Sequence, residues 1–243
     1  LARGLPFTSA YHTRFPEDVR ARVRIPLAWS YRLMRHFHAP SHAVLVAAQS
    51  ILEELTAEGF RNLVPWSRGV DITAFYPRAR TDVGDPRPIW LYAGRVAIEK
   101  NIKAFLDLDM PGSKWVAGDG PQFQQLRRRY RQVRFFGSLD TRDLSRCYGE
   151  ADCLVFPSRT DTFGLVMVEA LASGLPVAGF PVPGPIDIVT TPQVGALDDD
   201  LRLACLKAVM CDPQDCRRHA ETFTWERCAA QFLASLRPIP RAA

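Results

Sequence analysis

Short apolar runs alternate with segments of helical pattern through the second half of the sequence, and this alternation restricts the possible folds most strongly. The apolar runs have the length of buried strands and cover residues 89–93, 114–117, 133–136, 153–156 and 176–179. Helices are expected between them at residues 101–108, 122–131, 141–150 and 164–173, with a helical turn at 185–189. Strands that alternate with such helices form a parallel sheet with crossover connections. The sequence therefore predicts an α/β fold with a Rossmann-like domain.

The first 75 residues show a shorter pattern of the same kind. Strands are expected at residues 6–11, 42–48 and 62–66, and a helix is expected from Gln49 to Gly59, with Ser50 as its N-cap. Residues 76–88 contain three prolines, a glycine and several charges, a composition typical of a linker. Two further helices are expected at residues 199–210 and 224–236. The predicted division is a partial N-terminal domain (1–76), a linker (77–88), a C-terminal domain (89–223), and a helix with a tail (224–243).

The charge of the chain is only mildly basic. The sequence of 243 residues has 31 Lys and Arg against 26 Asp and Glu, a formal net charge of +5, with an ordinary globular content of 47% hydrophobic residues. Arg residues cluster at 11–35 and 127–131, where they suit phosphates, anionic lipid headgroups or nucleic acid. Solvated helix faces explain either cluster equally well. Because no known reading motif accompanies the clusters, a nucleic-acid partner is disfavoured.

The six cysteines form no C-x-x-C pair, and no histidine spacing completes a zinc site. This pattern indicates a reducing compartment, so we expect a cytoplasmic protein. No apolar run approaches about 18 residues, so no membrane-spanning helix is expected. The sequence begins without Met or a signal-peptide core, and it resembles a piece of a longer chain.

Two carboxylates, Asp161 and Glu169, follow the predicted strand at 153–156 with seven residues between them. Gly164 lies between the two, where the next helix is expected to begin. A strand followed by a loop and a helix N-terminus is where open α/β sheets bind anionic ligands. Isolated acids at this spacing are more often solvated surface residues, so the prediction depends on the whole surrounding phrase.

Two cations follow the first strand of the same predicted sheet. Gly94 and Arg95 close the strand, and Lys100 lies five positions after Arg95. Arg presents a fork to phosphate oxygens and Lys a point charge, so the two together would hold a diphosphate. A pair of exposed basic residues without a ligand is the alternative.

Several phrases occur in the order and spacing of the retaining GT-B glycosyltransferases of family 4, which the chain resembles over nearly its whole length. The phrases are residues 92–95 (YAGR), 99–101 (EKN), 118–121 (GDGP), 133–137 (VRFFG), 151–158 (ADCLVFPS) and 161–170 (DTFGLVMVEA). Residues 69–71 (GVD), with Phe75 and Pro77, resemble the end of the family's first domain. Residues 8–13 (TSAYHT) resemble the strand end that presents its active-site histidine. Bacterial enzymes that glycosylate lipids or polysaccharides, including the sulfoquinovosyl-diacylglycerol type, are the nearest kind.

The resemblance implies catalytic roles for His12, Arg95, Lys100 and Asp161. Arg95 and Lys100 would bind the donor diphosphate and stabilise it as the leaving group. Asp161 would contact hydroxyls of the donor sugar, although Asp is the shorter acid at this place. His12 would reach the transferring sugar from the other domain. A satisfied core histidine is the alternative for His12.

The resemblance also implies a set of donor-binding residues. Glu169 would accept hydrogen bonds from the ribose hydroxyls. The amides of Phe163 and Gly164, at the start of the helix, would point toward the donor. The base would lie near Phe136 and Gly137. The implied donor-binding residues are Gly94, Arg95, Lys100, Phe136, Gly137, Asp161, Phe163, Gly164, Leu165 and Glu169.

The implied reaction is sugar transfer with retention. A nucleotide-sugar, such as a UDP-sugar or GDP-mannose, would lose its nucleoside diphosphate, and the hydroxyl of a lipid or glycan acceptor would attack the same face of an oxocarbenium-like species. We expect no cofactor and no metal. Residues 198–200 (DDD) are typical of acids at a helix start rather than of a metal motif.

Measured against the usual size of a Rossmann domain, roughly one hundred residues of the first domain are expected to be missing. The chain would then be a fragment, a natural truncation, or one half of a split enzyme. A nucleotide-sugar-binding fragment without transfer activity is the alternative function, and a sugar-nucleotide epimerase or a phosphorylase is a third class. Basic and apolar residues interleave at 20–24 and 31–37, which suggests either a peripheral contact with the inner face of a membrane or an ordinary amphipathic helix.

Overall fold

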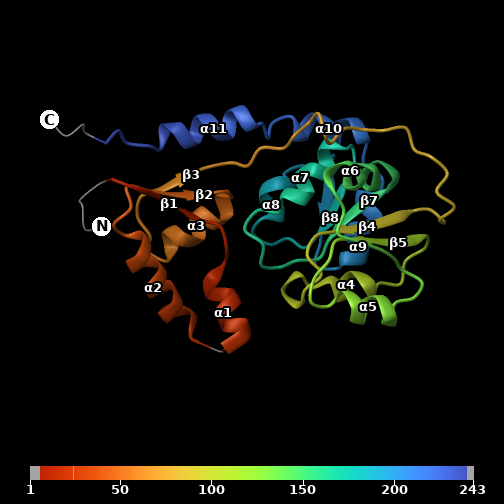
Figure 1. Ribbon diagram of the computed structural model, residues 1–243, viewed down its shortest axis with the longest axis horizontal. Helices are drawn as coiled ribbons and strands as arrows, with labels where there is room; N and C mark the ends of the chain where they lie inside the picture. Colours follow the sequence, from red (N-terminus) through yellow and green to blue (C-terminus); the bar gives the residue numbers. More distant parts are fainter. Residues whose placement is uncertain (1–5, 24, 240–243) are drawn as a thin grey trace.

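The computed structural model describes residues 6–23 and 25–239, which form two parallel sheets (Figure 1). The larger sheet has six strands in the order β6-β5-β4-β7-β8-β9, and every neighbouring pair is parallel. Its strands are β4 (Ile89–Ala93), β5 (Ser113–Ala117), β6 (Arg134–Gly137), β7 (Cys153–Phe156), β8 (Val177–Gly179) and β9 (Gly195–Leu197). The predicted α/β fold with a Rossmann-like sheet is confirmed.

Helices cover both faces of this sheet, because residues along each strand alternate between two apolar clusters. In β4, Leu91 packs in the cluster of α6 (Thr141–Glu150), α7 (Leu165–Ala172) and α10 (Pro213–Ala220), whereas Trp90 packs in the cluster of α4 (Ile102–Leu106), α5 (Phe123–Arg129) and α9 (Leu201–Ala208). The short elements η1 (Ile98–Lys100) and α8 (Pro185–Ile188) also follow strands of this sheet. Both faces of the sheet are therefore buried, and ligands can approach only at its edges and ends.

The smaller sheet has the order β1-β2-β3, and both of its strand pairs are parallel. Its elements are β1 (Thr8–Tyr11), α1 (Phe15–Val23), α2 (Leu27–His38), β2 (Ala43–Val46), α3 (Gln49–Ala57) and β3 (Leu63–Pro65). The three predicted strands are all present. Residues 1–5 of the predicted first domain and residues 240–243 of the predicted tail lie outside the described residues. Residue 24 of the basic stretch also lies outside them.

One expectation needs correction, and two elements were not expected. Ser50 does not cap α3, because the N-cap is Ala48, and the amide and hydroxyl of Ser50 bond to Asp187 instead. The short strand β9 and the helix α10 were not predicted, although Asp212 accepts a hydrogen bond from Gln214 N as an N-cap of α10. The end of α3 was predicted correctly, since Gly59 follows it with a φ of +78°.

The last helix, α11 (Trp225–Ala234), returns along the first domain (Figure 1). Trp66 Nε1 donates to Cys228 O at 3.1 Å, and Ser67 Oγ donates to Gln231 Oε1 at 2.8 Å. Thr224 caps the start of α11 and accepts from Arg227 N at 3.1 Å. The helix α11 therefore packs on the domain that contains β1, and it fixes the segment that follows β3.

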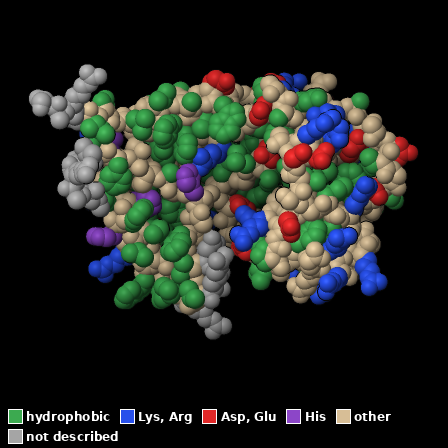
Figure 2. Space-filling model, viewed as in Figure 1, with side chains coloured by type: hydrophobic (Ala, Val, Ile, Leu, Met, Phe, Trp, Pro, Cys, Tyr) green, Lys and Arg blue, Asp and Glu red, His purple; other side chains and the backbone are tan. Residues whose placement is uncertain are grey.

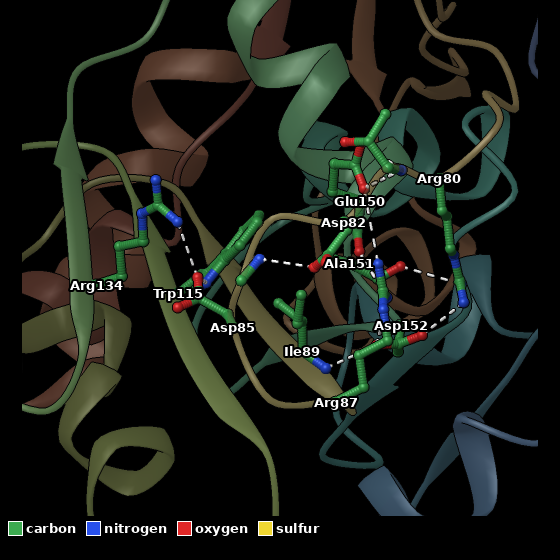
Figure 3. Close-up of polar contacts among 12 residues, drawn as sticks. Arg80, Asp82, Asp85, Arg87, Ile89, Trp115, Arg134, Glu150, Ala151 and Asp152 are labelled. Carbon is green, nitrogen blue, oxygen red and sulfur yellow. Dashed lines mark hydrogen bonds and ion pairs between the residues drawn. The ribbon is translucent and has the colours of Figure 1, made fainter.

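The segment between the two sheets is bound to the larger one. No helix or strand is found between Trp66 and Pro88 in the described part of the chain. Figure 3 shows the polar contacts there, which centre on Asp152: its carboxylate accepts from Arg80 Nη1 at 2.6 Å, from Arg87 Nη1 at 2.9 Å and from Ile89 N at 2.7 Å. Two cations and one amide thus neutralise a nearly buried carboxylate, and they hold the linker against the start of β4.

Candidate functional site

A cavity of about 480 Å³ opens between the two domains at the carboxyl ends of β1, β4 and β7. This is the edge at which open parallel sheets bind ligands. Eight of the predicted site residues line it: His12, Gly94, Arg95, Lys100, Asp161, Phe163, Gly164 and Leu165. Residues that are 150 positions apart in the sequence are therefore brought to one place.

The end of β4 forms one wall of the cavity, and local backbone contacts fix its position. Gly94 has a φ of +139°, and its amide donates to Ala117 O at 2.9 Å. The Tyr92 hydroxyl donates to Arg95 O at 2.6 Å. The Arg95 side chain remains largely exposed, 3.8 Å from a carboxylate oxygen of Glu99. The backbone under Arg95 is thus held while its guanidinium can turn toward a ligand.

Lys100 and Asp161 form an ion pair across the cavity. Asn101, which follows Lys100, adopts the left-handed conformation with a φ of +52°, and its Nδ2 donates to Pro157 O at 3.0 Å. This contact ties the loop of Lys100 to the end of β7, from which the loop of Asp161 begins. The two opposite charges therefore meet because their loops follow adjacent strands.

Two buried polar atoms in this cavity lack a partner. Neither Asp161 Oδ2 nor Ser158 Oγ has a hydrogen-bond partner among the residues that the structure describes. Buried polar atoms are normally paired, because each unpaired one costs about 1–3 kcal/mol. Both residues line the cavity, so a ligand that moves these side chains on binding would bring its hydroxyl groups within reach of the two atoms.

Helix α7 begins at the cavity, and Gly164 is required at its start. Gly164 has a φ of +90°, and a Cβ atom there would lie 2.6 Å from Met167 Cε and 3.0 Å from Phe156 Cζ. Phe163 is buried against Phe223, with ring centroids 6.1 Å apart. The first turn of α7 thus directs its partial positive charge toward the cavity, as expected for a site that binds an anion.

His12 enters the cavity from the first domain. Its carbonyl oxygen accepts from Thr162 Oγ1 at 2.8 Å, and its ring nitrogen Nδ1 contacts Arg68 Nη2. Burial, followed by the nearby Arg68 cation, lowers the pKa of the His12 imidazole from its ordinary value of 6.5. The imidazole is therefore neutral at neutral pH.

A second contact joins the domains beside the cavity. Asp187, at the start of α8, accepts from Ser50 N at 2.8 Å and from Gly184 N at 3.1 Å. Gly184 has a φ of +95°, and a Cβ atom there would lie 3.0 Å from Asp161 O. The N-terminus of α3 is thus attached to the loop that packs on Asp161.

Three predicted residues do not line this cavity, and their roles stay predictions. The carboxylate of Glu169, on α7, accepts from the hydroxyl of Tyr148, on α6, at 3.0 Å. Phe136 packs on Trp115, with ring centroids 5.2 Å apart, and Gly137 O accepts from Gly118 N at 2.7 Å.

The cavity also contains residues that the sequence analysis did not single out: Arg68, Tyr92, Ser158, Thr162 and Trp225. Arg68 directly precedes the phrase at 69–71, and Tyr92, Ser158 and Thr162 lie inside the phrases already noted, so a signal existed for these four. Trp225 had none, because only the return of α11 brings it near Gly69.

Among residues 6–23 and 25–239, no group of three or more His, Cys, Asp or Glu side chains could hold a metal ion. Within the same ranges, no helix has both the length and the hydropathy that crossing a membrane requires. The exposed apolar side chains of α2 gather on the first domain, where Figure 2 shows a broad apolar area; they are Trp29, Leu33 and Phe37. A membrane contact there stays an expectation, because no contact of the described residues shows what covers this face.

The chain is similar to several characterised glycosyltransferases. It is 32% identical over 206 residues to the GDP-mannose-dependent alpha-mannosyltransferase of Mycobacterium tuberculosis, an alignment that covers 80% of this chain and 54% of the relative. It is 30% identical over 211 residues to the sulfoquinovosyl transferase SQD2 of Arabidopsis thaliana, covering 79% and 41%. The chain thus spans about half the length of the curated relatives that it matches.

Solved structures show the same fold at lower identity. A variant of TarM from S. aureus superposes with a TM-score of 0.77 at 18% identity, covering 95% of this chain and 50% of that one. Anabaena HepE in complex with UDP-glucose superposes with a TM-score of 0.75 at 19% identity, covering 95% and 72%. These neighbours are GT-B glycosyltransferases, so the chain has the GT-B fold. Residues 87–203 match the family model described as glycosyl transferases group 1, and the chain therefore carries a domain of the group 1 glycosyl transferase family.

Proposed function

We propose that this chain carries the donor site of a glycosyltransferase, which moves a sugar from a nucleoside diphosphate to the hydroxyl of a lipid or glycan acceptor, with retention. The observation that carries the proposal is the pairing of two cations with two unsatisfied polar atoms in one cavity. Arg95 and Lys100 suit a diphosphate, while Ser158 Oγ and Asp161 Oδ2 await hydroxyl donors. A nucleotide-sugar supplies both groups.

Known relatives support this donor class. One matching relative is GDP-mannose-dependent, and one structural neighbour holds UDP-glucose. Nucleoside diphosphates share the diphosphate and ribose, so both would engage the same cations of this cavity. The two donors differ in the base of the nucleotide. The residues that would contact the base are not among the cavity residues named above.

The Lys100–Asp161 ion pair suggests how the site changes on binding. A diphosphate carries more negative charge than one carboxylate, so it would replace Asp161 as the partner of Lys100. Asp161 would then be free to accept a hydrogen bond from a sugar hydroxyl. Lys100 would then pair with the diphosphate, and hydrogen bonds from the sugar rather than a cation would satisfy the Asp161 carboxylate.

In the proposed reaction, the bond between the anomeric carbon and the diphosphate oxygen breaks, and Arg95, Lys100 and the start of α7 stabilise the developing negative charge. The acceptor hydroxyl attacks the same face, forms the new glycosidic bond and loses its proton to the departing phosphate oxygen. The donated sugar keeps its anomeric configuration. The residues named here supply charge and position rather than a covalent nucleophile.

A donor-binding unit without transfer activity is the second candidate. It is favoured by one observation: the chain spans 54% and 41% of the two curated relatives, so residues outside this sequence would supply acceptor contacts. Both candidates require nucleotide binding, and they differ only in turnover.

Calorimetric titration with UDP, GDP and ADP tests the donor site. We expect one diphosphate to bind, and Arg95→Ala to weaken its binding about 10- to 100-fold, the loss expected for a charge-assisted phosphate contact. Arg128→Ala is the matched control, because Arg128 is an exposed residue of α5 outside the cavity. If a folded wild-type chain bound none of the three, the proposal would be wrong.

Glu169 gives the proposal a pH dependence. Burial raises the pKa of its carboxyl above the ordinary value of 4.5, against a smaller lowering by the Tyr148 hydroxyl. Protonation removes the charged acceptor for ribose hydroxyls, so nucleotide affinity is expected to fall as the pH drops through this raised pKa. The folded state binds this proton more tightly than the unfolded state does, so Glu169 itself makes the fold more stable as the pH falls. Weaker binding at low pH would therefore not reflect unfolding caused by Glu169.

The control for this pH dependence is Glu169→Gln, which cannot titrate. It should bind nucleotide more weakly at neutral pH, and its affinity should change less with pH than that of the wild type. A Glu169→Gln titration series with the full wild-type slope would show that another group is responsible.

A further inference from the structure

We propose that Arg68 is a positioning residue for His12: its guanidinium donates to Nδ1 of the imidazole and fixes the neutral ring with its proton on Nε2. The contact joins Arg68 Nη2 to His12 Nδ1, and both residues line the cavity between the domains. Arg68 follows β3, and His12 directly follows β1, so the contact lies within the first domain.

The chemistry of the two groups determines the direction of this hydrogen bond. A guanidinium has five N–H donors, no acceptor, and a charge that it does not lose in proteins. His12 Nδ1 must therefore be the acceptor, which requires that Nδ1 carries no proton. An imidazolium has protons on both nitrogens and cannot make this contact. The only ring form that fits is the neutral tautomer protonated at Nε2.

The surroundings of Arg68 hold its guanidinium in place. The guanidinium lies over the ring of Trp66, 4.2 Å from the ring centroid, and the His12 ring lies 5.8 Å from the same tryptophan. Trp66 in turn is anchored on α11, through its bond to Cys228 O and its packing on Phe232 at 5.7 Å. The last helix of the chain thus fixes the cation that orients a residue of the first strand.

The charges around His12 favour the same ring form. Arg68 is the charged group in contact with the ring, and it disfavours a second positive charge there. Across the cavity lie Arg95 and the paired Lys100 and Asp161, so no unpaired anion of the lining compensates an imidazolium. Thr162, which packs on His12 from the loop before α7, is uncharged.

The consequence for recognition rests on the proposed function. With Nδ1 occupied, Nε2–H is the ring group that remains for a ligand, and it can only donate. His12 would then bind a hydroxyl oxygen of the transferring sugar as a hydrogen-bond donor. It could not accept the proton of the attacking hydroxyl, so that proton must go to the departing phosphate.

Nuclear magnetic resonance of the chain labelled with ¹⁵N-histidine tests the proposal without any ligand. Long-range ¹H–¹⁵N spectra distinguish the two neutral tautomers, and His12→Gln identifies the signals of His12. We expect an unprotonated Nδ1 and a protonated Nε2 in the wild type at neutral pH. A proton on Nδ1, or a doubly protonated ring, would overturn the proposal.

Three variants separate positioning from general structural support. Arg68→Met keeps a long side chain over Trp66 but cannot donate, so the single-tautomer signal should be lost and the pKa of His12 should move back toward 6.5. Arg68→Lys retains a donor and should restore the Nε2–H tautomer. Thr162→Val removes only the bond to the His12 carbonyl and should leave the ring signals unchanged. A single Nε2–H tautomer in Arg68→Met would show that Arg68 is not its cause.

Nucleotide binding distinguishes this proposal from the proposed function. Arg68→Met should still bind the diphosphate, because Arg95 and Lys100 remain, although Arg68 itself lines the cavity. In a transfer assay, its kcat should fall about 10- to 100-fold, as for a misplaced group at the reacting centre, and Arg68→Lys should recover part of the loss. The predicted tautomer without any nucleotide binding would refute the donor site and leave the role of Arg68 intact. Nucleotide binding by a chain whose His12 carries a proton on Nδ1 would refute the role of Arg68 and leave the donor site intact.

Discussion

Replacing Lys100 with alanine is expected to weaken binding of the nucleoside diphosphate about 30- to 100-fold, which corresponds to about 2–3 kcal/mol for one charge-assisted contact. The effect has two parts. The variant loses a cation that faces the diphosphate, and it leaves Asp161 without its ion-pair partner, as a negative charge beside the ligand. Calorimetric titration at constant salt measures the change.

The matched variant is Asp161→Asn, which removes the charge of the partner and keeps Lys100. The ammonium group is then no longer shared with a carboxylate, so diphosphate affinity should stay the same or rise by a few-fold. The two substitutions meet at one contact, so the double variant should not show the sum of the single effects. If Asp161→Asn weakened binding as much as Lys100→Ala does, the intact ion pair would form the site rather than the lysine charge.

The larger sheet could be predicted from the sequence because its pattern is local. Each strand of the sheet from β4 to β8 is a short apolar run, and each is followed by a helix or a helical turn of its own. The strand β9 (Gly195–Leu197) is too short and too poor in large apolar residues to stand out, and its pairing with β8 decides its conformation. The order of the strands is likewise a tertiary property.

The site could be predicted only where it is contiguous. Residues 161–165 and 94–100 belong to loops that follow strands of one sheet, so their meeting at one edge follows from the fold class. The contact of His12 with Arg68 depends on three segments: the end of β1, the chain after β3, and the return of α11. Nothing near either residue in the sequence indicates that third segment.

Ser50 shows how tertiary context overrides a local signal. A serine at the start of an apolar helical pattern is a good N-cap candidate. Here the carboxylate of Asp187, 137 positions later, accepts from both the amide and the hydroxyl of Ser50. The orphan amide of Ser50 at the start of α3 therefore finds a charged partner in the other domain, which is a stronger acceptor than a neutral side chain.

Gly118→Ala is expected to destabilise the protein by about 3–5 kcal/mol, which is the range of the most disruptive single substitutions. Gly118 has a φ of +133°, and a Cβ atom there would overlap the carbonyl oxygen of Gly94 and lie 2.8 Å from its carbonyl carbon. Both obstructing atoms belong to the backbone, so no side-chain rotation relieves the overlap, and the ends of β4 and β5 would have to separate. The midpoint and slope of urea unfolding measure the loss.

Gly84→Ala is the control, because it shares the positive φ but not the contact. Gly84 has a φ of +73°, and a Cβ atom there would meet no atom within 4 Å. Its substitution should cost only the conformational penalty of about 1–2 kcal/mol. Because Gly94 lines the cavity, Gly118→Ala should also weaken diphosphate binding, whereas Gly84→Ala should not. Equal losses of stability in the two variants would mean that backbone conformation alone, and not the close approach of the two strand ends, requires glycine at position 118.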